Sequence, residues 1–479
     1  MNLAELKSFT DRQWDEDLIP RLVDYVKVPA KSPGFDASWA AHGYLQSVVQ
    51  SAYLWAVAQN IDGMAIEVVE IPGRTPCIFF DVPATGGRGN DKTVLFYGHL
   101  DKQPEMSGWR DDLGPWTPVI ENGKLYGRGA ADDGYAIYAA MSIIAALDAQ
   151  GAARPRCVGI IETCEESGSP DLPFYLDLLA PRLGDVALVA GLDSGCGNYE
   201  QLWVTTSLRG LVGGTITVEV LTEGVHSGKA SGIVPSSFRI ARQLMNRIDD
   251  PATGRVLDEA FHAAIPAERL IQAKLAGEIL GDQVWQEFPW VGCNHGPDGH
   301  AHAMPTTTDP VEGILARTWR PALSVTGAAG FPAIDSAGNV LRPKTTFKLS
   351  MRIPPTVDGE RAAHALRRIV TADAPYNAKV TFEGESAATG WNAPPTAPWL
   401  KRAADSASKA VWNKDAAWMG EGGTIPFMNM LGEKFPRAQF LITGVLGPHS
   451  NAHGPNEFLH IPYVKQLTAA VAGIVAAVE

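Results

Sequence analysis

Short apolar runs alternate with longer helical patterns over about the first two hundred residues. Three runs rich in β-branched residues predict buried strands at Thr93–Tyr97, Cys157–Thr163 and Val186–Leu192. Gly134–Leu147 is apolar nearly all round, which predicts a buried helix between the first two strands. Strands that alternate with helices indicate an α/β domain with a mostly parallel, mixed sheet flanked by helices.

The pattern changes near Leu208. Gly213–Leu221 alternates as a strand with one exposed face, and Ser236–Ile248 has the pattern of an amphipathic helix. Further segments continue this mixture, namely strands Thr345–Ile353 and Ala378–Glu383, helix Gly359–Thr371, and room for another strand near Ala322–Val325. This order predicts an inserted α+β domain of ferredoxin-like type.

The α/β pattern returns after the insert. Trp399–Trp412 is helix-like, Gln439–Thr443 is strand-like, and a closing helix starts at Ile461. We therefore expect one domain in two parts, residues 1–208 and 386–479, interrupted by a second domain at 209–385.

Composition excludes several classes of protein. Of the 479 residues, 45% are hydrophobic and 19% charged, as in ordinary folded domains. The formal net charge of −13 should repel phosphate backbones and anionic lipids, so no nucleic acid or membrane partner is expected. The longest apolar runs, Ala136–Leu147 and Leu467–Val478, are shorter than the roughly twenty residues that span a bilayer.

The cysteines favour a reducing compartment. Their number is odd and no C-x-x-C pair occurs among Cys77, Cys157, Cys164, Cys196 and Cys293. The first twenty residues also lack the basic segment followed by an apolar stretch that marks a secretion signal. We expect a cytoplasmic protein.

Chemistry-bearing side chains follow the predicted strands, and the carboxyl ends of parallel strands are where reactive groups gather. Three strands are followed in turn by His99 with Asp101, by Glu165 with Glu166, and by Asp193. Near the start of the buried helix lie Asp132 and Asp133, and a loop after the strand Gln439–Thr443 carries His453.

These residue types suit a pair of zinc-type divalent cations, because imidazole and carboxylate are competent ligands and two metals need a shared oxygen donor. His99 and Asp101 are two residues apart, so the aspartate can accept the second N–H of the imidazole. Of two adjacent glutamates, one can bind metal while the other accepts a proton from water. The set predicts a hydrolytic site.

Each motif alone has a more ordinary explanation. An H-x-D pair is often on the surface, a Glu-Glu pair often ends a solvated loop, and an Asp-Asp pair often caps a helix. Their coincidence at successive strand ends favours a metal site. A second cluster lies in a glycine- and proline-rich part of the insert, where we favour a loop without metal and leave its role open, at Cys293, His295, Asp298, His300 and His302.

Five strings resemble, in the same order, the family of two-zinc peptidases that includes aminoacylases, carnosinase-type dipeptidases and carboxypeptidase G. The strings are GHLDKQP at 98–104, GRGAADDG at 127–134, ETCEESGS at 162–169, GLDSG at 191–195 and H-x-x-N-E at 453–457. The resemblance covers most of the chain and implies a catalytic domain with an inserted lid and dimerisation domain.

The resemblance also implies a ligand set. Asp132 bridges two metals, His99 and Asp193 complete one site, and Glu166 and His453 complete the other. Two divalent ions per subunit are implied, with zinc expected first and manganese or cobalt as alternatives.

Two further residues receive catalytic roles from the resemblance. Glu165 matches the general base, and Asp101 matches the partner of His99. The family also typically has a cis peptide bond between the residues that match Asp132 and Asp133.

In the insert, residues 224–228 resemble the lid motif whose histidine, here His226, reaches the neighbouring subunit's active site and polarises the scissile carbonyl. This implies a homodimer formed through the inserted domain. Arg352 matches an arginine that grips the substrate carboxylate, to which a bidentate guanidinium is suited. A glycine-rich loop that closes around the substrate terminus is matched by Glu421, Gly422, Gly423 and Thr424.

Three positions bear on the substrate. Gly134 stands where the family often has lysine, and Gly420 stands where carnosinase-like members have arginine. Asp193 stands where carboxypeptidases and deacylases tend to have glutamate, which favours dipeptidase or aminopeptidase chemistry.

We therefore expect a metal-dependent hydrolase that cleaves the amide bond of dipeptides or similar small peptides. The alternatives are an N-acyl-amino-acid deacylase or carboxypeptidase, and a non-catalytic protein that binds metal or peptide. A binder would not need a proton acceptor such as Glu165, so the last alternative is disfavoured.

Overall fold

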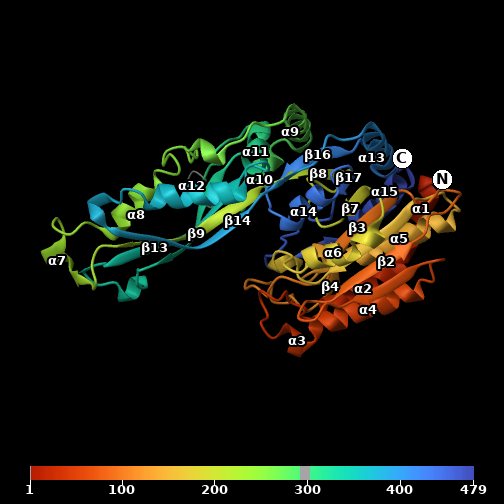
Figure 1. Ribbon diagram of the computed structural model, residues 1–479, viewed down its shortest axis with the longest axis horizontal. Helices are drawn as coiled ribbons and strands as arrows, with labels where there is room; N and C mark the ends of the chain where they lie inside the picture. The colour runs from red at the N-terminus through yellow and green to blue at the C-terminus, as the bar shows by residue number, and fades with distance from the viewer. Residues whose placement is uncertain (1, 292–302) are drawn as a thin grey trace. The chain divides into compact units, whose positions relative to one another are not determined.

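The computed structural model describes residues 2–291 and 303–479 (Figure 1). The chain divides into two compact units. The first unit comprises Met1–Thr206, Ala393–Met419 and Met430–Glu479, and the second comprises Ser207–Asn392 and Gly420–Asn429. The cysteine- and histidine-containing cluster at 293–302 lies outside the described residues.

The described part of the chain contains a main sheet of nine strands. Along the sheet the order is β1 (Ala65–Val69), β2 (Cys77–Val82), β6 (Arg156–Glu162), β3 (Thr93–His99), β7 (Val186–Gly191), β17 (Gln439–Ile442), β8 (Trp203–Leu208) and β15 (Trp391–Asn392), with β16 (Ala417–Glu421) also paired to β8.

Parallel pairing joins the strands in the middle of this sheet. Strands β6, β3, β7 and β17 run parallel, whereas β1 pairs antiparallel with β2, β2 with β6, and β8 with β17 and β15. Every residue of β3 is buried, as expected for a parallel strand covered on both faces. The predicted mixed, mostly parallel sheet is confirmed.

Helices flank the main sheet. Their bounds are α1 (Leu3–Gln13), α2 (Ile19–Val26), α3 (Trp39–His42), α4 (Tyr44–Ala58), α5 (Ala136–Ala149), α6 (Leu172–Leu183), α13 (Pro398–Trp412), α14 (Pro426–Lys434) and α15 (Ile461–Ala476). Helix α5 packs on β3 and on α15, which buries nearly all of its side chains and accounts for its uniformly apolar sequence. A small sheet is formed by β18 (Phe458–His460), β5 (Lys124–Tyr126) and β4 (Val119–Glu121).

Helix α5 begins later than the sequence predicted. It starts at Ala136 with Tyr135 in the N-cap position and has no side-chain cap, and Asp132 and Asp133 lie before that position with non-helical backbone angles. The explanation of these aspartates as ordinary helix caps is therefore wrong. The peptide bond between them is cis, as the family resemblance implied.

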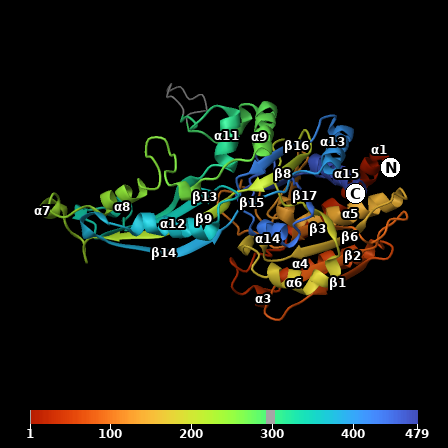
Figure 2. The same cartoon turned by 45° about the horizontal axis from the view of Figure 1, so that its top comes forward.

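The second unit is built on a four-stranded antiparallel sheet. Its order is β11 (Ala322–Ala329), β13 (Lys344–Ile353), β9 (Gly210–Glu219) and β14 (Lys379–Ala388). Helices α8 (Ser237–Met245) and α12 (Gly359–Thr371) pack on this sheet around one core (Figure 2). This βαββαβ arrangement is the predicted ferredoxin-like fold, and the strand expected near Ala322–Val325 is an edge strand.

Several other elements of the second unit have no clear signal in the sequence pattern. They are β10 (Val225–His226), α7 (Ser227–Ala230), α9 (Ala267–Leu280), α10 (Gln283–Gln286), α11 (Pro310–Thr318) and β12 (Val340–Leu341). Across both units, no helix in the described residues combines the length and apolar character needed to cross a membrane.

Candidate metal centre

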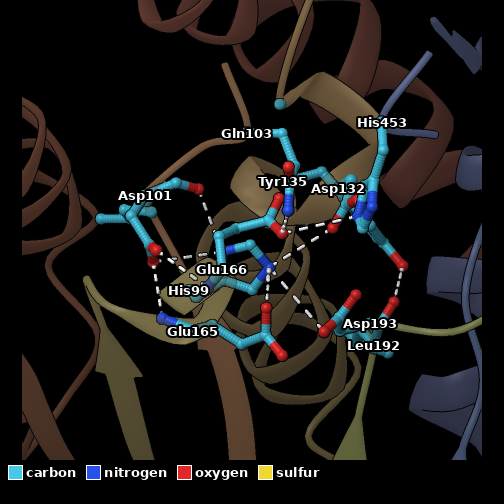
Figure 3. A network of polar contacts seen from close by, with 12 residues as sticks. His99, Asp101, Gln103, Asp132, Tyr135, Glu165, Glu166, Leu192, Asp193 and His453 are labelled. Carbon is cyan, nitrogen blue, oxygen red and sulfur yellow. Dashed lines mark hydrogen bonds and ion pairs between the residues drawn. The ribbon is translucent and has the colours of Figure 1, made fainter. Parts of the chain in front are cut away.

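Two histidines and four carboxylates gather in the first unit at the ends of the central strands (Figure 3). They come from segments far apart in the sequence, because parallel strands bring their carboxyl ends to one edge. His99 ends β3, Glu165 and Glu166 lie in the turn after β6, Asp193 follows β7, Asp132 precedes α5, and His453 lies in the loop after β17.

Asp132 lies between the two histidines. Its Oδ1 is 3.4 Å from Nε2 of His99, and its Oδ2 is 3.0 Å from Nε2 of His453. The two oxygens of one carboxylate therefore face two different imidazoles. A carboxylate shared by two cations has this arrangement.

The other acids divide between the two histidines. Oδ2 of Asp193 is 3.7 Å from Nε2 of His99, and Oε2 of Glu166 is 3.4 Å from Nε2 of His453. Oε2 of Glu165 is 4.0 Å from Nε2 of His99. The structure thus brings together all six side chains that the sequence singled out as ligands or base.

Ligand atoms within 4.8 Å of one another form two groups in the described residues. One group is His99, Asp132 and Glu166, and the other is His99, Glu165 and Asp193. A carboxylate oxygen of each glutamate therefore lies close enough to the other potential ligand atoms of its group to share a metal ion with them.

The cluster carries more negative charge than its histidines can offset. Burial raises the pKa of Glu165, of Glu166 and of Asp193, the last to about 7. Burial would also raise the pKa of Asp132, but His453 and His99 lower it overall. Buried carboxylates need compensation, and divalent cations supply it.

Buried atoms without a hydrogen-bond partner also indicate bound cations. Nε2 of His99 and Oε1 of Glu166 are buried and have no hydrogen-bond partner. Buried polar atoms are normally satisfied, so such atoms need an explanation such as an ion. The donors present fit two divalent cations in number and chemistry.

Asp101 connects the histidine and glutamate segments. Its side chain is fully buried, with Oδ1 accepting the N–H of Glu165 at 3.1 Å and Oδ2 that of Glu166 at 3.0 Å. Nδ1 of His99 lies 3.1 Å from the Asp101 carbonyl and 3.4 Å from its carboxylate. This one residue orients the imidazole and fixes the turn that carries both glutamates.

Two neighbours of the cluster were not singled out from the sequence. Gln103 donates through Nε2 to Oε2 of Glu166 at 2.6 Å, and the Tyr135 hydroxyl donates to the Leu192 carbonyl beside Asp193 (Figure 3). The position of Gln103 two residues after Asp101 is a signal that could have found it. Tyr135 looks like any aromatic residue at the start of an apolar helix.

The predicted substrate-binding residues lie in the second unit. Nη1 of Arg352 donates to the Thr424 hydroxyl at 2.6 Å, and that hydroxyl donates to the Arg209 carbonyl at 2.7 Å. Nε of Arg209 donates to the Gly422 carbonyl at 3.2 Å. Arg352 therefore contacts the glycine-rich loop directly at Thr424, and Arg209, which the sequence did not indicate, holds the same loop at Gly422 and Thr424.

The remaining predicted residues of the second unit differ in exposure. His226 is exposed on β10, and Gly423 is also exposed, with open space where a side chain would be. Burial raises the pKa of Glu421, with Arg317 opposing the shift.

Comparison with known proteins adds independent findings. The model of Peptidase family M20/M25/M40 matches residues 95–478. The chain is 25% identical over 390 residues to cysteinylglycine-S-conjugate dipeptidase of Corynebacterium striatum, covering 80% of each protein. It is 27% identical over 393 residues to Cys-Gly metallodipeptidase DUG1 of Saccharomyces cerevisiae, covering 78% of this chain and 77% of that protein.

Among solved structures, human carnosine dipeptidase 1 has the same fold. The TM-score is 0.75 at 20% sequence identity, and the match covers 100% of this chain and 99% of that chain.

Proposed function

The chain belongs to peptidase family M20/M25/M40, and we propose that it is a metal-dependent dipeptidase that hydrolyses the amide bond of dipeptides or similar small peptides. The main support for the proposal is the position of Asp132, whose two carboxylate oxygens face His99 and His453. The dipeptidases among its relatives support the substrate class. Asp193, in place of glutamate, favours the same choice over a deacylase or carboxypeptidase.

The proposed ligands divide into two sets that share one residue. His99, Asp132 and Asp193 would hold the first cation. Asp132, Glu166 and His453 would hold the second cation. Nitrogen and oxygen donors without thiolate suit zinc, with manganese and cobalt as alternatives. When bound, such cations polarise a carbonyl and lower the pKa of water toward about 7.

Glu165 is the proposed general base. Burial, reinforced by Asp193, raises its pKa, so it binds a proton more readily than an exposed glutamate does. It takes the proton of the attacking water and returns it to the leaving amine. Asp101 holds the backbone N–H of Glu165 and so limits where its carboxylate can lie.

Substrate recognition is assigned to the second unit. Arg352 binds the substrate carboxylate, and the loop of Glu421, Gly422, Gly423 and Thr424 closes around it. Burial lowers the pKa of Arg352, and its bond to Thr424 fixes the guanidinium beside that loop. His226 polarises the scissile carbonyl.

The proposed assembly is a homodimer formed through the inserted domain. Ile233 and Ile334 in the second unit are 84% and 90% exposed, and Phe331 is 48% exposed. A partner subunit that covered these side chains would remove their apolar surface from water. The proposed compartment is the cytoplasm, which the free thiols of Cys77, Cys157, Cys164 and Cys196 support.

Metal analysis and a substrate panel test the proposal. The purified protein should contain two divalent ions per chain, lose activity with a chelator and recover it when metal is returned. The panel compares unblocked dipeptides with N-acyl amino acids and longer peptides with free carboxyl ends. Preferential cleavage of N-acyl amino acids would replace the dipeptidase proposal with the deacylase alternative, and no cleavage of any amide would remove the enzymatic proposal.

A further inference from the structure

We propose that the buried pair Arg128 and Glu457 positions His453 and thereby sets the affinity of the second cation. The two side chains are 1% and 0% exposed and form an ion pair in the first unit. The inference rests on the proposed function, because it takes His453 as a ligand. It assigns roles to two residues that touch neither cation.

His453 is held differently from His99. The His453 side chain is 55% exposed, whereas that of His99 is completely buried. Asp132 and Glu166 contact only the Nε2 end of the His453 ring, and much of the rest of the side chain is uncovered. Its backbone has a φ of 64°, in the left-handed region that non-glycine residues rarely adopt. The direction of this side chain depends on how its loop is held.

Arg128 binds the backbone of that loop. Nη2 of Arg128 donates to the His453 carbonyl at 3.0 Å and to the Gly454 carbonyl at 2.9 Å. Nη1 donates to the Glu457 carboxylate, and Nε donates to the Pro104 carbonyl at 3.2 Å. A planar guanidinium presents its N–H groups in a fixed fork, so it holds these acceptors in one geometry.

Glu457 ties the loop to the segment that carries Asp132. Its Oε1 accepts the N–H of Gly129 at 2.9 Å, and its carbonyl accepts the N–H of Gly127 at 3.0 Å. Gly129 is three residues before Asp132. The pair thus joins the loop of His453 to the segment of Asp132, which carry two of the three proposed ligands of the second cation. Removing one partner leaves a buried charge unpaired, which forces the loop to shift.

The test measures metal affinity and does not depend on catalysis. Chelator-treated protein and its Arg128→Gln variant are titrated with Zn²⁺ against a competing chelator, which yields two binding constants. We expect the first constant to be unchanged and the second to weaken by about 10- to 100-fold, the range for loss of a group that orients a ligand. Arg128→Lys should recover only part of the affinity, because an ammonium cannot reach all four acceptors.

Arg154 provides a matched control. It is also fully buried in the first unit, and it donates to Asp148 and to the Pro83 carbonyl. Arg154→Gln should leave both constants unchanged. An equal loss of the second constant in this variant would overturn the inference, because any buried arginine would then have the same effect.

His453→Ala separates the two proposals. If this variant keeps both constants, the proposed ligand set is wrong. If it loses the second constant while a folded Arg128→Gln variant keeps it, the ligand set stands and the positioning role of Arg128 is wrong. If Arg128→Gln does not fold, Glu457→Gln takes its place, since it keeps the shape but not the charge. An unchanged second constant in folded Glu457→Gln would equally overturn the inference.

Discussion

The proposed metal ligands of the first unit and the proposed substrate residues of the second unit are held in different ways. His99 is completely buried, and Asp132 is 4% exposed and contacts both histidines. His226, by contrast, is exposed on a two-residue strand, and Arg352 is fixed mainly through a loop hydroxyl. Buried strand ends fix positions more firmly than surface segments do. Substitutions in the two units should therefore affect different steps.

The largest effect is expected for Glu165→Gln. Loss of the proposed base should lower kcat by about 10²- to 10⁴-fold, the usual contribution of a general base, while metal content stays the same. Steady-state kinetics and metal analysis check this. Glu166→Gln is the matched control. Glu166 is the adjacent proposed ligand, so this variant protein should lose bound metal as well as activity. Full turnover in Glu165→Gln would remove this residue from the chemistry.

His226→Ala comes next, with an expected fall in kcat of about 10²- to 10³-fold through loss of carbonyl polarisation. Its dimer role is tested by mixing it with Glu165→Gln after dissociation. If His226 acts in the neighbouring subunit, mixed dimers have one intact site, and about a quarter of the wild-type activity should return. No recovery in verified mixed dimers would place His226 in the active site of its own chain or outside the reaction.

Arg352→Gln should act on binding more than on turnover. A charge-assisted hydrogen bond to a carboxylate is worth about 1.5–3 kcal/mol, so KM should rise by roughly 10- to 100-fold with a smaller change in kcat. Arg368→Gln is the control, because this exposed arginine of the same unit pairs with Asp258. A fall in kcat at constant KM would contradict carboxylate binding.

The smallest effect concerns stability. Glu162 is buried under the cluster and accepts hydrogen bonds from Tyr97 at 2.6 Å and Ser169 at 2.9 Å. Burial raises its pKa from 4.5 to about 7 although these bonds oppose the shift. The folded state therefore keeps a proton that the unfolded state releases, and its stabilisation disappears as pH rises through about 7.

We expect this residue to contribute about 2 kcal/mol to the difference in unfolding free energy between pH 5 and pH 7. Urea unfolding of Glu162→Gln should show the correspondingly smaller pH dependence, since a neutral amide keeps an acceptor for Tyr97 and Ser169. Glu219→Gln, an exposed glutamate paired with Lys379, serves as the control. An unchanged pH dependence in Glu162→Gln would show that the carboxyl is ionised throughout.

Much of the fold followed from local pattern. Runs such as Thr93–Tyr97 are apolar throughout because parallel strands are covered on both faces, and they occur in the structure with ends shifted by only a few residues. The three helices α9, α10 and α11 of the second unit were not predicted, because sequence periodicity does not show which segments of a long insert pack together. Lys102 shows that residue type alone can also fail to predict burial, because lysine side chains are rarely buried. It is buried and donates to three backbone carbonyls at the end of α2 and just beyond it.

The residue types that can bind metal, and their places after successive strands, were determined by the sequence itself, because imidazole and carboxylate chemistry is local to each side chain. The sequence could not determine which oxygen of Asp132 faces which histidine, that Asp101 ties the Glu165–Glu166 turn to His99, or that Arg128 holds the loop of His453. Those relations join residues up to 325 positions apart. Only packing of the strands and loops in three dimensions brings such residues within hydrogen-bond distance.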